Sequence, residues 1–200
     1  AIQEHLEVIY GIRAGYRAKD FLVDAEAARQ LGGSGRAREE LLVSGGAEGL
    51  ELALYVEPEL LARVSSTVPE RAMATDMGDF CEVAEGVSHF LYVTHAASME
   101  RTVSLLELEA QAEVDKFAVC TLLKWGLNVG RWAGTLVGRL FERVQFRAGL
   151  SELERWRYVE ANRLAKTYCE RLLPVVRSGR MDRLLSELRH GYRLGAEAKL

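Results

Sequence analysis

The chain has 200 residues, of which 48% are hydrophobic and only three are proline, so it is long and apolar enough to bury a substantial core. This composition excludes an intrinsically disordered chain. Three widely spaced cysteines without a Cys-x-x-Cys motif exclude a disulfide framework and a thiolate zinc site, and they favour a cytoplasmic location.

Charge is divided unevenly along the chain, although the net charge is only −3. Residues 1–123 contain 10 Lys and Arg against 21 Asp and Glu, a net charge of −11, whereas residues 124–200 contain 16 against 8, a net charge of +8. These opposite charges could neutralise each other within one molecule, pair between subunits or attract outside partners.

The N-terminus lacks the basic segment and the long apolar run of a signal peptide. The first 76 residues show mixed helical and strand patterns. β-branched and aromatic residues from His5 to Ile12 predict a strand, and Asp24 predicts the cap of a short helix. The runs ELLVS and GLELALYV flank GGAEG, and strict alternation in the second run predicts a β-hairpin with one packed face. Pro58 then predicts the start of another helix, which completes a β-α-β-β-α order.

An irregular segment from Val68 to Met77 predicts a boundary between two domains, a small α/β domain over residues 1–76 and a helical bundle domain over residues 77–200. Helix starts after this boundary are indicated by three capping-box pairs, and Pro174 predicts the end of the third of these helices. A last helix is expected from Met181 to about Leu194. We therefore expect an α+β protein with a C-terminal bundle of about five helices. The three capping pairs are Asp79 with Glu82, Ser104 with Glu107, and Ser151 with Glu154.

The segment from Ser104 to Trp125 carries two separate apolar stripes at helical spacing, so we expect a central helix that is covered on two sides. Glu109 and Glu113 lie one turn apart in a gap between these stripes. Since burying isolated charges is costly, we expect a cation to neutralise both, either Lys116 or an arginine of the basic half. The alternatives are a metal ion shared with His89 and exposure of both carboxylates to water.

Four glycines recur every four residues after the central helix, and each costs about 1 kcal/mol in an exposed helix relative to alanine. The spacing therefore predicts close approach of a neighbouring helix or a homodimer face. Basic residues interrupt this segment, so a membrane span is not predicted. The glycines are Gly126, Gly130, Gly134 and Gly138.

Carboxylates and one imidazole on two of the expected helices form a candidate site for a divalent metal ion, because bundle metal sites use such ligands from adjacent helices. The Glu85-x-x-x-His89 spacing differs from the Glu-x-x-His of di-iron bundles, which counts against this site. The candidate ligands are Glu82, Glu85, His89, Glu109 and Glu113.

Basic residues with interleaved aromatics in the C-terminal half are candidate contacts for anions or nucleic acid. Acidic residues intersperse the same helix, which favours a solvated face instead. The candidate contacts are Arg155, Arg157, Arg163, Lys166 and Arg171.

Catalytic and nucleotide-binding motifs are absent, since the sequence contains no Gly-Lys pair for a Walker A loop, no His-Glu-x-x-His and no Gly-x-Ser-x-Gly. We therefore expect a non-enzymatic interaction or regulatory protein that binds a protein partner or a second copy of itself. The alternatives are a metal-binding helical protein, with oxidoreductase activity as one use of the metal, and a nucleic-acid binder. No membrane association is expected.

Overall fold

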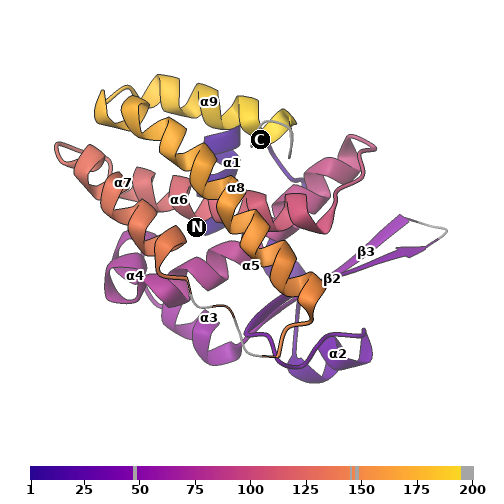
Figure 1. Cartoon of the computed structure of the whole chain (residues 1–200). Coiled ribbons are helices and arrows are strands. Elements are labelled where there is room, and N and C mark those ends of the chain that lie inside the picture. Colours follow the sequence, from indigo (N-terminus) through magenta and orange to yellow (C-terminus); the bar gives the residue numbers. More distant parts are fainter. Residues whose placement is uncertain (47–48, 145, 147–148, 195–200) are drawn as a thin grey trace. The chain divides into compact units, whose positions relative to one another are not determined.

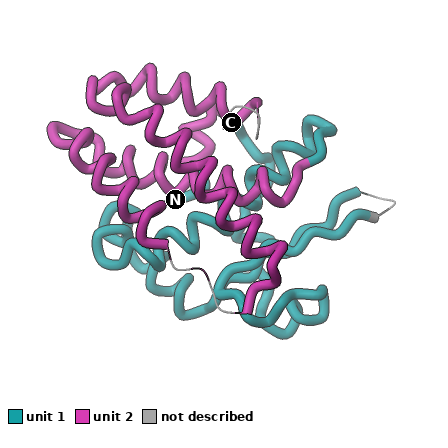
Figure 2. The backbone as a smooth tube through the Cα atoms, in the orientation of Figure 1, with its two compact units in different colours: residues 1–4, 12–102 teal, residues 5–11, 103–200 magenta. Residues whose placement is uncertain are grey.

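The computed structural model describes residues 1–46, 49–144, 146 and 149–194. The chain divides into two compact units (Figure 2), of which unit 1 comprises Ala1–Glu4 and Ile12–Thr102, and unit 2 comprises His5–Gly11 and Val103–Leu200. A small three-stranded sheet in the N-terminal region is followed by a bundle of helices, so the predicted α+β class is confirmed. Within the described residues, no helix has both the length and the apolar character needed to cross a bilayer.

Unit 1 combines the sheet with several helices (Figure 1). Strand β3 is central, with β1 parallel on one side and β2 antiparallel on the other. The predicted hairpin is therefore confirmed, and it pairs Leu41 with Leu54 and Val43 with Leu52. The elements are η1 (Ala18–Phe21), β1 (Leu22–Val23), α2 (Ala25–Gln30), β2 (Glu39–Gly46), β3 (Gly49–Val56), α3 (Pro58–Ser65), α4 (Pro69–Thr75) and α5 (Met77–Ser98).

Helix α5 forms the core of unit 1 together with the sheet, because it packs against β2, β3, α3 and α4. Phe80 and Phe90 are fully buried, and the Phe90 ring lies 4.9 Å from the ring of Phe21. The two compact units differ from the two predicted domains, which meet between residues 76 and 77, because α5 belongs to unit 1. The apolar face of α5 needs the sheet as cover, so α5 groups with the N-terminal elements.

The strand predicted from His5 to Ile12 is wrong, because this part of the chain is the helix α1 (Ile2–Tyr10). Its buried residues are Ile2, Leu6, Ile9 and Tyr10, which recur with the period of a helix rather than that of a strand. Burial of this helical stripe outweighs the β propensity of the individual residues.

Two local predictions near residue 76 also differ from the structure. The irregular segment after Val68 contains α4, which has Pro69 in its first turn. Helix α5 is capped by Asp76, whose side chain accepts a hydrogen bond from the Asp79 backbone N–H at 3.0 Å. Asp79 therefore lies inside the helix. Its carboxylate does not cap the helix and instead forms the ion pairs described below.

Unit 2 is helical throughout its described residues. The caps predicted at Ser104 and Ser151 are confirmed, and Ser151 forms a complete capping box with Glu154. Pro174 does not end its helix. It is exposed and stands in the last turn, where water can solvate the carbonyl that loses its partner. The elements are the last part of α1, α6 (Leu105–Leu123), α7 (Val129–Val137), the π-helical turn η2 (Gly138–Glu142), α8 (Glu152–Arg177) and α9 (Met181–Leu194).

Helix α6 is buried over most of its length, which confirms that the central helix is covered on more than one side. Ala110 packs with Ala161 and Leu164 of α8, and Cys120 accepts a hydrogen bond at its carbonyl from the Trp132 indole at 3.0 Å. Helix α7 also packs against α8, so α6, α7 and α8 form the centre of unit 2.

Candidate functional site

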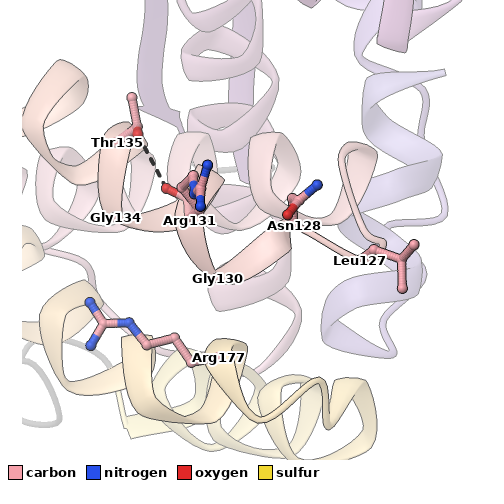
Figure 3. A pocket seen from close by; sticks show the side chains of 7 residues that line it. All are labelled: Leu127, Asn128, Gly130, Arg131, Gly134, Thr135 and Arg177. Atoms are coloured by element: carbon pink, nitrogen blue, oxygen red, sulfur yellow. Dashed lines mark hydrogen bonds between the residues drawn. The ribbon is translucent and has the colours of Figure 1, made fainter.

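A pocket of about 640 Å³ opens in unit 2 where the start of α7 meets the end of α8 (Figure 3). The turn between α6 and α7 contributes two residues, the first turns of α7 contribute four, and the end of α8 contributes one. The lining residues are Leu127, Asn128, Gly130, Arg131, Gly134, Thr135 and Arg177.

Gly130 brings the two helices close enough to form this pocket. A Cβ atom at position 130 would lie 2.9 Å from Cγ and 3.1 Å from Cα of Arg177, which is closer than side chains pack in proteins. Only glycine therefore allows α8 to pass α7 at this distance. The close approach brings Arg177 into the same pocket lining as Arg131, although 46 positions separate them in the sequence (177 − 131).

The charge of the pocket is positive and uncompensated. Arg131 and Arg177 are exposed, and no carboxylate of the described residues lies within ion-pair distance of either guanidinium. The lining includes no acidic residue.

Hydrogen-bond donors complete the lining. Asn128 occupies the N-cap position of α7, yet its side chain makes no capping hydrogen bond, so its amide is available to a ligand. Thr135 donates its hydroxyl to the Arg131 carbonyl at 3.1 Å and holds the first turns of α7 in place. Two guanidinium groups and an amide suit the oxygen atoms of a phosphate or carboxylate group.

The seven lining residues include no carboxylate, imidazole or thiol, and their polar groups are guanidinium, amide and hydroxyl groups. The arrangement can bind and orient an anionic group.

The basic residues predicted as anion contacts lie along α8, away from the pocket lining. Three of the five are close to carboxylates of unit 2: Arg163 contacts Glu160 at 2.6 Å, Lys166 contacts Glu142 at 2.9 Å, and Arg157 lies 3.7 Å from Glu109. The hydrogen bond from Lys166 to Glu142 raises the lysine pKa, and that from Arg163 lowers the pKa of Glu160. Arg155 and Arg171 are exposed. Much of the predicted basic face is therefore neutralised within unit 2.

The predicted metal ligands are divided between the two units, with Glu82, Glu85 and His89 on α5 and the other two on α6. On α5, Glu82 contacts Arg38 at 2.8 Å, and His89 Nδ1 lies 3.4 Å from Glu39. Burial raises the pKa of Glu82, and the positive charge of Arg38 opposes this effect. Glu85 is half-buried. The metal site stays a prediction.

Glu109 and Glu113 on α6 both have cationic neighbours in unit 2. Lys116 donates to Glu113 at 2.7 Å, and the Arg157 guanidinium lies 3.7 Å from Glu109. Each carboxylate therefore has a lysine or arginine neighbour of the expected kind, and neutralisation by these cations in place of a metal ion stays a prediction.

The glycine series has one member in close helix contact. Gly130 meets Arg177 as described above, whereas a Cβ at Gly126 or Gly134 would meet no atom within 4 Å, and one at Gly138 would meet only Glu142 at 3.6 Å. Contact of the other glycines with a second molecule stays a prediction.

Sequence reasoning missed a network of charges in unit 1. Arg38 contacts Glu57 at 2.8 Å and Asp79 at 3.0 Å, and Arg63 contacts Asp79 at 2.6 Å. The hydrogen bond from Arg63, followed by that from Arg38, lowers the pKa of the Asp79 carboxyl despite its burial. Arg38 directly precedes β2, and Glu57 lies between β3 and α3. Arg63 is on α3 and Asp79 on α5, so no local sequence pattern predicts that these four residues lie close together.

Sequence reasoning also missed a buried polar cluster in unit 2. Tyr10 donates its hydroxyl to Asp115, and Gln111 donates its amide to Asp115 at 2.6 Å. The ring of Tyr192 stacks on that of Tyr10 with a centroid distance of 4.0 Å. Burial, followed by the Asp115 charge, raises the Tyr10 pKa well above its usual value. A sequence signal existed, because Gln111 and Asp115 stand one turn apart between the apolar stripes of α6.

Comparison with known proteins identifies no relative, since the chain matches no protein-family model, no curated protein and no solved structure.

Proposed function

We propose that this chain is a non-enzymatic binding protein that holds the phosphate or carboxylate group of a ligand in the pocket between α7 and α8. The observation that carries the proposal is the pair Arg131 and Arg177, whose guanidinium groups line one pocket without an acidic residue beside them. Repulsion between these two positive charges raises the free energy of the folded protein, and an anion bound in the pocket would offset this repulsion. A bound phosphate or carboxylate accepts two parallel hydrogen bonds from each guanidinium.

The helix α7 adds to this preference for anions. Its first N–H, that of Val129, donates to the Gly126 carbonyl at 3.1 Å, and the dipole of the helix is positive at the Asn128 end. Leu127, which is fully exposed beside the pocket, offers an apolar contact to the rest of a ligand. A small anion attached to an apolar group therefore fits the lining best.

A cytoplasmic setting belongs to the same proposal. Cys81, Cys120 and Cys169 are all free thiols and all buried, which suits a reducing compartment.

Isothermal titration calorimetry at low salt tests the proposal with inorganic phosphate, pyrophosphate and citrate as probes. Arg131→Gln and Arg177→Gln should each weaken binding about tenfold, because a hydrogen bond to a charged group contributes roughly 1.5–3 kcal/mol. The probe that binds tightest distinguishes a phosphate ligand from a carboxylate ligand.

Arg155→Gln is the matched control. Arg155 is an exposed arginine on the same helix α8, 22 positions before Arg177, which corresponds to roughly 33 Å along the helix. The control should bind like the parent. Equal loss in all three variants would point to a diffuse basic surface, and a short DNA or RNA duplex that bound with the same loss would favour nucleic-acid binding instead.

A further inference from the structure

Strand β2 is an edge strand with an open side. The strand order β1-β3-β2 leaves β2 with β3 as its single neighbour among the described strands. No backbone hydrogen bond joins the outer side of residues 40–45 to any other described segment. Every second residue of an antiparallel edge strand directs its N–H and C=O outward, so this side offers a row of donors and acceptors.

Beyond Glu39 and Glu40 at its start, β2 lacks the residues that usually protect an edge strand. Leu41, Leu42, Val43, Ser44, Gly45 and Gly46 follow each other without a charged residue or a proline. Natural edge strands prevent association with charges, prolines or bulges, and an edge without them is a template for another strand.

An apolar sheet face accompanies the open edge. Paired residues share a face, so Val43 and Leu52 lie together, as do Leu41 and Leu54. Leu54 is buried in unit 1, whereas Val43 is 48% exposed and Leu50, farther along β3, is 44% exposed. The apolar face thus continues along the β2–β3 hairpin beyond the buried Leu54. Figure 1 shows the course of this hairpin.

We propose that β2 is a dimerisation strand that pairs, antiparallel, with β2 of a second copy of this chain. A two-fold axis perpendicular to the sheet joins identical segments and keeps each face of the sheet on its own side. A register centred on Val43 satisfies this symmetry, and it forms one six-stranded sheet with a continuous apolar face.

Charge also favours a second copy as the occupant. In the register centred on Val43, Glu40 of one copy lies opposite Gly46 of the other, and Leu41 lies opposite Gly45. The acidic residues at the start of the strand therefore do not face each other across the dimer. The segment that does pair with itself carries no charge.

Sedimentation equilibrium of the full chain from low to high micromolar concentration tests this proposal. The parent should form dimers as concentration rises. Val43→Lys, which introduces a charge next to its own symmetry mate, should stay monomeric. Leu50→Lys places the same charge on the same face of the neighbouring strand and should still dimerise, since it is not at the edge. Thermal unfolding of both variants verifies that they fold.

Disulfide trapping tests the register. Val43→Cys should give a covalent dimer under mild oxidation, because Cα atoms of directly opposed residues are about 4.5–5.5 Å apart, within the range of a disulfide. Leu50→Cys should not, because the two copies of β3 would be separated by three strand spacings, roughly 14 Å. The native cysteines are buried and do not compete. A parent that is monomeric at every concentration, or a Leu50→Cys variant that cross-links as readily as Val43→Cys, overturns the proposal.

Discussion

Tyr10 and Asp115 show how one buried pair organises its surroundings at the scale of single residues. Asp115 is only 2% exposed, and it accepts hydrogen bonds from Tyr10 and Gln111. A buried carboxylate is stable only when donors surround it, so removal of a donor costs more than the hydrogen bond itself. The stacked ring of Tyr192 excludes water from the same place.

Tyr10→Phe should lower the free energy of unfolding of unit 2 by about 1–3 kcal/mol, because it leaves the Asp115 carboxylate one donor short. Local stability measured by hydrogen exchange in α6 and α9 is the readout, since a chain with two compact units need not unfold in one step. Tyr16→Phe, at a tyrosine that is 62% exposed, is the control and should change little.

Alkaline pH provides a second readout of the same tyrosine. Tyrosine in an unfolded chain has a pKa of about 10, and burial beside Asp115 raises the pKa of Tyr10 in the folded protein. Between these values the unfolded chain releases a proton that the folded chain keeps, so stability is complete below about pH 10 and falls as pH rises further. Tyr10→Phe should make the loss of folding stability with rising pH smaller. An unchanged slope would show that Tyr10 does not contribute to it.

At the scale of elements, Gly130 and Gly134 are alike in sequence and different in surroundings. Both lie on α7, four residues apart, where glycine costs about 1 kcal/mol relative to alanine. Gly130 faces the backbone of α8 at Arg177, and Gly134 faces open space.

Gly134→Ala should therefore stabilise unit 2 by up to about 1 kcal/mol, whereas Gly130→Ala should destabilise it by about 1–3 kcal/mol through overpacking. Hydrogen exchange in α7 and α8 measures both changes. Two alanine variants with the same effect would mean that α7 and α8 do not pass each other as closely as described.

At the scale of the whole molecule, a segment near the N-terminus groups with the C-terminal part of the chain. His5–Gly11 belongs to unit 2 with residues that follow it by more than ninety positions. Arg189 donates to the carbonyls of Val8 and Ile9 at 3.0 and 2.9 Å, which satisfies acceptors at the end of α1. Gly11 ends that helix with a φ of +64°, a conformation that glycine adopts without strain.

Arg189→Ala should speed hydrogen exchange at the end of α1 and in α9 together, because both segments lose the same two hydrogen bonds. Arg193→Ala, on the same helix at an exposed position, is the matched control. Faster exchange in α9 alone would show that α1 does not depend on this contact.

Local features of the structure followed from the sequence by itself. Alternation from Leu50 to Val56 predicts β3, Pro58 predicts the start of α3, and Ser104 and Ser151 predict the starts of α6 and α8. Each of these signals depends on residues within one turn or one strand, so local propensity, hydrogen bonding and periodicity suffice. The α+β class followed from their order along the chain.

Long-range contacts were decided only by the tertiary structure. The residues from His5 to Tyr10 become helical because burial in the fold outweighs their β propensity. Arg131 and Arg177 line one pocket because Gly130 lets two helices approach. Sequence spacing does not encode such proximity, since packing selects among many helix arrangements with similar local energy. The fold class could thus be derived from local patterns, whereas the candidate site required the packing of α7 on α8.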